Sequence, residues 1–150
     1  MAITHKKARQ LRDAVRRLVV AHGALEEARR PCGAEMSLPN AHALLELLGS
    51  DEPMTVSGLA EKLAIDRTNV SRLCARMEEA GELARQAHPD DARARALRLT
   101  AHGKKLARSV DDSSAHHFAG LTQALGGSTA RVIESLELLE RAMAQSEDDE

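Results

Sequence analysis

Hydrophobic residues recur at spacings of three and four along most of this chain, and that period predicts a mainly helical fold. The first stripe predicts one long helix over residues 4–30, which ends before Pro31 because proline disfavours helical backbone in the residue before it. After a loop, Ser37 is a suitable N-cap for a helix over residues 39–48 with proline in its first turn. Residues 49–53 then break the pattern.

The centre of the chain predicts two short helices joined by a tight turn. The first covers residues 57–64, after a very short strand at 54–55. The second covers residues 67–80; Asp66 is a good N-cap for it, and Gly81 closes it. Hydrophobic residues at i, i+3, i+4 and i+7 predict the buried face of this second helix. That face consists of Val70, Leu73, Cys74 and Met77.

After these helices the period changes to two. Hydrophobic and polar residues alternate over 83–86 and 94–99, which predicts two strands with a turn at Pro89. Thr100 is placed to cap a helix over 101–124, and a last helix over 128–145 follows two glycines. The fold class is therefore mostly α with a small β-hairpin, in one domain of 150 residues.

Composition narrows the possible activities. The chain has one Phe and no Tyr or Trp, so the core is expected to consist of Leu, Ala, Val and Met. The lack of aromatic side chains disfavours binding of single-stranded nucleic acid by base stacking. The net charge of −2 is unevenly distributed: residues 53–110 carry 11 basic and 7 acidic residues, whereas residues 111–150 carry 2 and 9. A cationic segment within an acidic protein indicates a local contact with a polyanion.

The second central helix carries the residues that we expect to bind DNA. Its polar face has no acidic residue, and its side chains can donate hydrogen bonds to base edges or phosphates. This face consists of Arg67, Thr68, Asn69, Ser71 and Arg72, with Arg76 one turn further on as a phosphate contact. Asparagine can pair with adenine and arginine with guanine, each worth about 1–3 kcal/mol of discrimination. The alternative is an ordinary solvated helix face.

The hairpin adds a second candidate contact. Arg93 is the residue that we expect to contact DNA from the hairpin tip. Asp91 cannot approach phosphate favourably, so its expected role is to orient Arg93 through a charge-assisted hydrogen bond. Arg95 and Arg98 can equally be ordinary strand surface.

Other chemistry receives little support. No phosphate-binding loop, nucleophile elbow, metalloprotease helix or metal-ligand spacing is present, so neither an enzyme nor a cofactor or metal site is expected. Cys74 lies on a hydrophobic helix face and is expected to be inert. Cys32 follows Arg29 and Arg30, and cations near a thiol favour the reactive thiolate, so Cys32 is the candidate for redox sensing.

Location is predicted from what the sequence lacks. No run of about 18 apolar residues is long enough to span a membrane. The hydrophobic run at residues 18–21 is too short for a signal peptide, and two cysteines do not form a disulfide framework. A cytoplasmic protein without a membrane contact is therefore expected.

The central pattern resembles the multiple-antibiotic-resistance regulator (MarR) family of bacterial transcription factors. Residues 38–48 resemble the second helix of that family, and residues 54–73 resemble its helix-turn-helix. Asp91-Ala-Arg93, followed by Leu-Arg-Leu-Thr at 97–100 and by Gly103, resembles its wing and the start of its fifth helix. The resemblance is good over residues 35–110, whereas the outer helices match only in length and hydrophobic pattern.

The resemblance implies a winged helix-turn-helix protein that forms a homodimer. Residues 4–30 and 101–145 would provide the dimerisation helices, and residues 38–100 the DNA-binding lobe of a single domain spanning 1–150. Such a protein would be a ligand-responsive repressor that binds double-stranded DNA at a pseudo-palindromic operator and releases it when a small-molecule effector binds. The sequence identifies neither the operator nor the effector.

Two residues depart from the family pattern, and two alternatives stay open. Ala92 stands where the wing often has arginine, and Gly58 stands where a glutamate often completes a capping box with Thr55. One alternative is a redox-responsive regulator acting through Cys32, although redox-sensing members usually carry the cysteine early in the first helix, where this chain has none. The other is a protein-interaction module of the same fold that does not read DNA.

Overall fold

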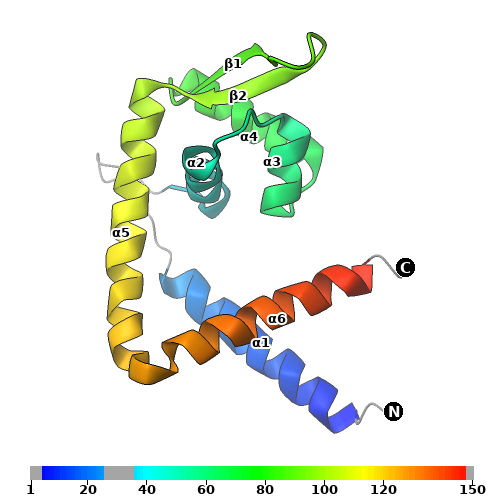
Figure 1. Ribbon diagram of the computed structural model, residues 1–150, viewed down its shortest axis with the longest axis vertical. Coiled ribbons are helices and arrows are strands. Elements are labelled where there is room, and N and C mark those ends of the chain that lie inside the picture. Colours follow the sequence, from blue (N-terminus) through cyan, green and yellow to red (C-terminus); the bar gives the residue numbers. More distant parts are fainter. Residues whose placement is uncertain (1–4, 26–35, 148–150) are drawn as a thin grey trace. The chain divides into compact units, whose positions relative to one another are not determined.

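The computed structural model describes residues 5–25 and 36–147. Its elements confirm the predicted fold class of helices with one small hairpin (Figure 1). They are α1 (His5–Leu25), α2 (Leu38–Gly49), α3 (Val56–Leu63), α4 (Arg67–Glu79), β1 (Leu83–Ala87), β2 (Arg95–Leu99), α5 (Ala101–Leu125), the 3-10 turn η1 (Gly126–Ser128) and α6 (Thr129–Glu147). The predicted end of the first helix before Pro31, and most of the loop after it, lie outside the described residues.

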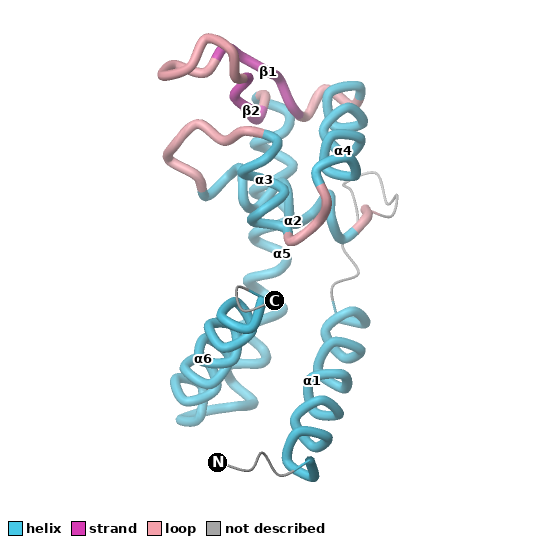
Figure 2. Tube along the Cα trace, turned by 90° about the vertical axis from the view of Figure 1, so that its right-hand side faces the viewer, coloured by secondary structure: helices cyan, strands magenta, loops and turns pink. Residues whose placement is uncertain are grey.

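The chain divides into two compact units, residues 1–113 and 114–150, and the division falls inside α5. In the first unit, α2, α3, α4 and the hairpin pack together, and we call this group the lobe. In Figure 2 the loop at the tip of the hairpin extends beyond the helices of the lobe. The organisation into one domain with separate dimerisation helices stays a prediction.

The core of the lobe has the composition expected from the sequence. The buried face of α4 is the predicted one, with Val70, Leu73, Cys74 and Met77 each at most 3% exposed. Hydrophobic residues of α2, α3 and the two strands pack against this face. Among them are Leu44, Leu59, Leu83, Leu97 and Leu99. A cluster of this size fixes the orientation of α4, so the opposite face of α4 has to point to solvent.

Short-range caps set where the helices begin. Ser37 accepts a hydrogen bond from the backbone N–H of Asn40 and caps α2, as predicted. Thr55 caps α3, which therefore begins at residue 56 and not at 57. Asp66 caps α4 by accepting from the N–H of Asn69, also as predicted. Between α3 and α4, Ala64 adopts the left-handed conformation with φ of 52°, and this closes the tight turn.

The hairpin forms a two-stranded sheet. Its strands are antiparallel, in a register from Leu83 opposite Leu99 to Ala87 opposite Arg95. The very short strand predicted at residues 54–55 is present as one bridge, because the N–H of Leu97 donates to the carbonyl oxygen of Met54 at 2.7 Å. The bridge joins the segment before α3 to β2 on the side away from β1.

A compact junction joins α4, the hairpin and α5. Gly81 ends α4 with φ of +73°, and the N–H of Glu82 donates to the carbonyl oxygen of Met77, which completes a Schellman motif. Thr100 caps α5 through the N–H of Gly103 and also donates its own N–H to the carbonyl oxygen of Glu82. A Cβ at Gly103 would lie 1.9 Å from that oxygen, so only glycine fits there.

Large hydrophobic side chains are exposed on the helices outside the lobe. On α1 these are Leu11, Leu18, Val19 and Val20, and on the C-terminal half of α5 and on α6 they include Phe118, Leu125, Ile133, Leu136, Leu138 and Met143. Each is at least 40% exposed in the single chain. When such side chains gather into one patch, the patch usually marks a surface that a partner covers.

Candidate nucleic-acid interface

The exposed face of α4 brings the predicted reading residues together. All six of them are exposed: Arg67, Thr68, Asn69, Ser71, Arg72 and Arg76. Four of them, with Ala75, line a shallow hollow of about 410 Å³ on the outer side of the helix. Those four are Arg67, Thr68, Ser71 and Arg72. One helix face therefore carries hydrogen-bond donors and acceptors along more than two turns, which is the arrangement that a major-groove reader requires.

The arginines of this face have their charges available. Across residues 5–25 and 36–147 the ion pairs are Arg12 with Asp13 and Arg85 with Glu78, so the arginines of the α4 face have no acidic partner there. An arginine without a partner keeps all five N–H donors for a phosphate or a guanine edge. Because no protein ion pair has to be broken first, the contact with a polyanion is favoured.

The side chain of Asn69 bonds to Asp66, the residue that caps α4. Its side-chain amide nitrogen donates to one carboxylate oxygen of Asp66, while its backbone N–H donates to the other. A carboxylate only accepts, so this contact directs one N–H of the Asn69 amide toward Asp66 and leaves the amide oxygen and the second N–H for another partner. The pairing with adenine that we predicted for Asn69 would use the amide oxygen and one N–H, so the bond to Asp66 can persist through the other N–H.

The tip of the hairpin is held by its own backbone and by Asp91. The carboxylate of Asp91 accepts from the backbone N–H of Arg93 at 2.9 Å, and the N–H of Ala94 donates to the carbonyl oxygen of Asp91. Asp91 therefore orients Arg93 through the main chain and not through the guanidinium, which differs from the predicted contact. The Arg93 side chain is exposed, and its guanidinium makes no hydrogen bond or ion pair in the described part of the chain.

Two other arginines of the hairpin form hydrogen bonds with neighbouring side chains. Arg98 donates to the side-chain oxygen of Gln86 across the hairpin at 3.2 Å. Arg85, on β1, donates to Glu78 at the end of α4 at 2.7 Å. This ion pair is the only one among the described residues that links the hairpin to α4, so it helps to fix the position of one candidate DNA-binding element relative to the other.

Of the two cysteines, Cys74 lies within the described residues and Cys32 does not. Cys74 is fully buried, as predicted, and burial raises the pKa of its thiol, with nearby Glu78 adding to the effect and Arg85 opposing it. Burial thus keeps Cys74 as the unreactive thiol. Cys32, the candidate redox residue, lies outside the described residues.

Two kinds of feature are absent from the described residues. No group of three or more His, Cys, Asp or Glu side chains among them is arranged to hold a metal ion. No helix within 5–25 or 36–147 has the length and hydrophobicity that a membrane crossing requires.

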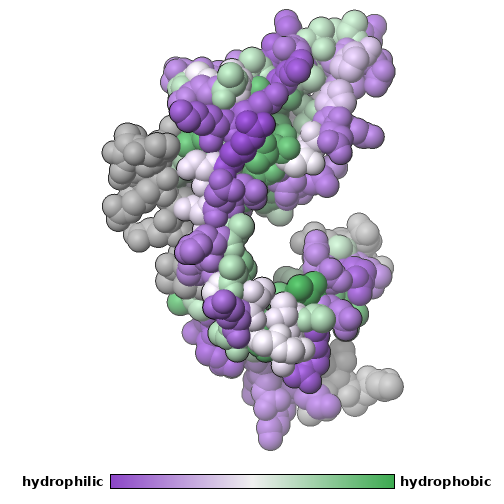
Figure 3. Space-filling model, turned by 60° about the vertical axis from the view of Figure 1, so that its left-hand side comes forward, coloured by the Kyte–Doolittle hydropathy of each residue, from purple (hydrophilic) through white to green (hydrophobic). Residues whose placement is uncertain are grey.

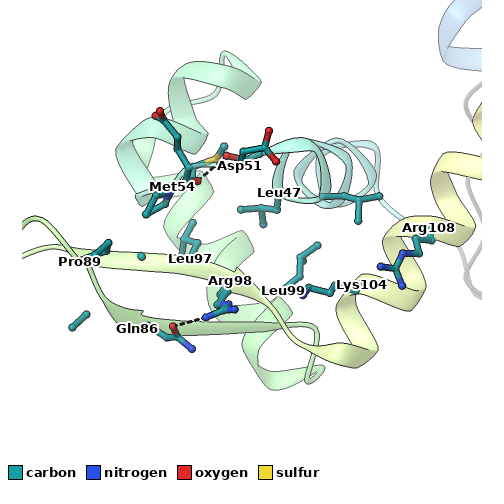
Figure 4. A pocket seen from close by; sticks show the side chains of 16 residues that line it. Leu47, Asp51, Met54, Gln86, Pro89, Leu97, Arg98, Leu99, Lys104 and Arg108 are labelled. Carbon is teal, nitrogen blue, oxygen red and sulfur yellow. Dashed lines mark hydrogen bonds between the residues drawn. The ribbon is translucent and has the colours of Figure 1, made fainter.

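Three features of this region were not predicted from the sequence. The Asp66–Asn69 contact could have been expected, because Asp-x-x-Asn has the spacing with which a capping residue meets its partner in the first turn. The Arg98–Gln86 contact depends on the hairpin register, and no signal in the sequence fixes that register. The third is a hollow of about 640 Å³ beside the hairpin, whose walls come from α2, the segment after it, both strands and α5 (Figure 4).

Comparisons with known proteins give the same picture. The sequence model of the MarR family matches residues 36–94. An uncharacterized HTH-type transcriptional regulator of Bacillus subtilis, YhjH, is 32% identical over 96 residues, which cover 64% of this chain and 50% of that protein. The match therefore spans about half the length of this relative.

Solved structures extend the comparison to the fold. The MarR family regulator SPO1453 from Silicibacter pomeroyi is 27% identical, with a TM-score of 0.61 over 72% of this chain and 76% of the other. The PcaV regulator from Streptomyces coelicolor, solved with its natural ligand, is 23% identical, with a TM-score of 0.69 over 89% and 91% of the two chains. The similarity to PcaV extends well beyond the lobe.

Proposed function

This chain belongs to the MarR family, and we propose that it regulates transcription by binding double-stranded DNA sequence-specifically through α4 and the hairpin. In this proposal α4 lies in the major groove, where Arg67 and Arg72 read base edges, while Arg76 and Arg93 contact phosphates. The observation that carries the proposal is the exposed α4 face, whose arginines have no acidic partner among the described residues.

We propose further that the protein acts as a homodimer. The exposed hydrophobic side chains of α1, α5 and α6 support this, since a second copy would remove them from water. A two-fold dimer presents two α4 helices, and they match successive major grooves when they lie about 34 Å apart. The operator would then contain two inverted half-sites about one helical turn apart.

The proposed mode of control is repression that a small molecule relieves. PcaV, which shares the fold of this chain, was solved with its natural ligand, and this supports the idea of a ligand-responsive protein. A ligand that favours a dimer in which the spacing of the two α4 helices no longer matches one DNA turn would lower operator affinity by shifting the population of states. The identity of that ligand is not part of the proposal.

The test is selection from random duplex DNA by the purified protein in about 150 mM salt, where contacts with phosphates alone are weak. We expect an enriched pseudo-palindrome, and Arg72→Ala should lose at least about tenfold affinity for it while its affinity for random DNA changes much less. Lys105→Ala, which removes an exposed charge on α5, is the matched control and should bind normally. If a folded protein enriches no sequence, the interaction-module alternative replaces this proposal.

A further inference from the structure

Two helices outside the lobe carry opposite charge, and on each the charged residues lie beside exposed hydrophobic ones. α1 has six basic residues and one acidic residue. α6 has four acidic residues and two basic ones. Figure 3 shows that hydrophobic and hydrophilic side chains both reach the surface outside the lobe. The DNA contacts proposed for α4 and the hairpin use neither helix, so those contacts leave the charges of α1 and α6 without a role.

On α1, three arginines form a row along the edge of the hydrophobic face. Arg9, Arg12 and Arg16 are three and four residues apart, so they lie on one side of the helix. Val19, which is 62% exposed, continues the row. Arg12 bonds to the neighbouring Asp13 in an exposed ion pair, which contributes little energy. Arg9 and Arg16 make no ion pair or hydrogen bond in the described part of the chain. A partner for this edge has to present acidic groups beside hydrophobic ones.

On α6, two glutamates continue the exposed hydrophobic face. Ile133 is four residues before Glu137, so the two lie on the same side of the helix. Leu136 is related to Glu140 in the same way. Both carboxylates are exposed, and neither makes an ion pair or hydrogen bond within residues 5–25 and 36–147. α6 therefore offers the combination of acidic and hydrophobic groups that the edge of α1 requires.

A second copy of the chain can supply both complementary faces. Within the single chain Ile133 stays 50% exposed, Leu136 45% and Leu18 of α1 50%. Contact with a second copy would remove such side chains from water, and the charges at their edges would then meet with less screening than on an open surface. In a two-fold dimer, a contact of α1 with α6 of the other copy occurs twice, because each copy meets the other in the same way.

We propose that the cationic edge of α1 lies against the acidic edge of α6 of a second copy, and that these charges select the partner. The cationic edge consists of Arg9, Arg12 and Arg16, and the acidic edge consists of Glu137 and Glu140. Opposite charges favour this pairing, whereas a chain without them would leave a cation or a carboxylate unpaired at the contact. The pairing rests on the proposed homodimer, to which it adds the surfaces that meet and the charges that make the contact specific.

Exchange of the charges tests this pairing without DNA. Arg9→Glu/Arg16→Glu makes the edge of α1 acidic, and Glu137→Lys/Glu140→Lys makes the edge of α6 basic. In about 150 mM salt, which screens charges more than about 8 Å apart, each variant alone should dimerise at least about tenfold more weakly than the wild type, because like charges then face each other. Sedimentation measures this loss. An equal mixture of the two variants should form mixed dimers with wild-type affinity, and native mass spectrometry identifies them by their intermediate mass.

Matched controls separate this contact from a general effect of charge. Lys6→Glu/Arg17→Glu reverses two charges on the side of α1 away from its hydrophobic residues. Glu134→Lys reverses one charge on the side of α6 away from Leu136. Both controls should dimerise like the wild type. The single variants Arg16→Glu and Glu140→Lys repeat the test if a double variant fails to fold.

Undiminished dimerisation of the edge variants, or equal losses in the controls, would overturn the proposal. So would a mixture that forms no mixed dimers; recovery only in a chain with all four reversals would then place the contact within one chain. If Arg9→Glu/Arg16→Glu lost affinity for duplex DNA while its dimer stayed intact, the arginine row would be a phosphate contact instead. A monomeric wild type would refute the proposed homodimer itself, whereas a wild-type dimer that these reversals leave unchanged would refute the pairing alone.

Discussion

At the residue scale, the contact between Asp66 and Asn69 determines what α4 can offer to a base. One N–H of the Asn69 amide is bonded to Asp66, so the amide oxygen and the second N–H remain. Held in this orientation, the amide can pair with adenine through its oxygen and its second N–H, or accept from the N4 amino group of cytosine through the oxygen alone. In the proposed function Asp66 would therefore position Asn69 for base recognition in addition to capping the helix.

Replacing Asp66 by serine tests this role. Serine keeps the N-cap but reaches only one partner, so the Asn69 amide is no longer held in one orientation. We expect the base preference at the position that Asn69 reads to weaken by about 1–3 kcal/mol, because the amide is no longer fixed for one base. Selection from random DNA measures the change, and Asn69→Ala should remove the preference in both backgrounds. If Asp66→Ser selects the same bases as the wild type, Asn69 does not read that position.

Cys74 gives a second prediction at this scale. Burial raises the pKa of its thiol above the usual value, so the thiolate is scarcer in the folded protein than in the unfolded chain. In a Cys32→Ser variant, which leaves Cys74 as the only thiol, iodoacetamide should label the native protein slowly and the urea-unfolded protein rapidly. The folded state then binds more protons than the unfolded one at alkaline pH, so its stability should fall as the pH rises above about 9. Equally fast labelling of both states would contradict the burial of Cys74.

At the element scale, replacing glycine by alanine should have opposite effects on stability at the two ends of the helix-turn-helix. Gly58 lies in the first turn of α3, and a Cβ there would make only ordinary contacts with Thr55 and Met54. Gly58→Ala should therefore stabilise the protein by up to about 1 kcal/mol, since glycine is the poorer helix former. Gly81 ends α4 with φ of +73°, and Gly81→Ala should cost about 1–2 kcal/mol.

Urea denaturation followed by circular dichroism measures both changes, because the chain has no Trp or Tyr to report unfolding by fluorescence. The opposite signs are the informative result, since the same methyl group is added in each case. Destabilisation by both variants would mean that Thr55 caps α3 in a geometry that tolerates no side chain at residue 58.

The elements that the sequence predicted well are those with local signals. Ser37, Asp66 and Thr100 each cap the helix expected of them, because a cap depends on residues within one turn. The fit of Gly103 against the carbonyl oxygen of Glu82 joins segments about 20 residues apart, and no local pattern indicates it. The hollow beside the hairpin was missed for the same reason. Lys104 and Arg108 are recognisable as like charges on one face of α5, but the hydrophobic wall beside them comes from α2 and β2.

At the scale of the whole molecule, charge and hydrophobicity are divided between segments. Residues 53–110 hold the positive charge and the candidate DNA contacts, whereas residues 111–150 have a strongly negative balance together with exposed hydrophobic side chains on α5 and α6. Negative charge would repel phosphate, so these helices are unsuited to a contact with DNA. Their hydrophobic side chains are instead suited to a contact with another helical surface, which agrees with the proposed dimer.

Ile133→Glu/Leu136→Glu tests that division of roles. Both residues are about half exposed on α6, so glutamates there should not disturb the core of the single chain. In a dimer the same charges would be buried without partners, which is strongly unfavourable. We expect sedimentation to show a monomer for this variant and a dimer for Glu134→Gln, the control on the same helix.

Operator binding should weaken together with the dimer. The two half-sites of a dimer act at a high effective concentration, so a monomer bound to one half-site should lose at least about a hundredfold in affinity. A monomer that still selects a single half-site would confirm that α4 and the hairpin read DNA without help from the other helices. A variant that stays dimeric would place the dimer contact elsewhere. A monomer that binds the full operator as tightly as the wild type would refute the role of dimerisation in recognition.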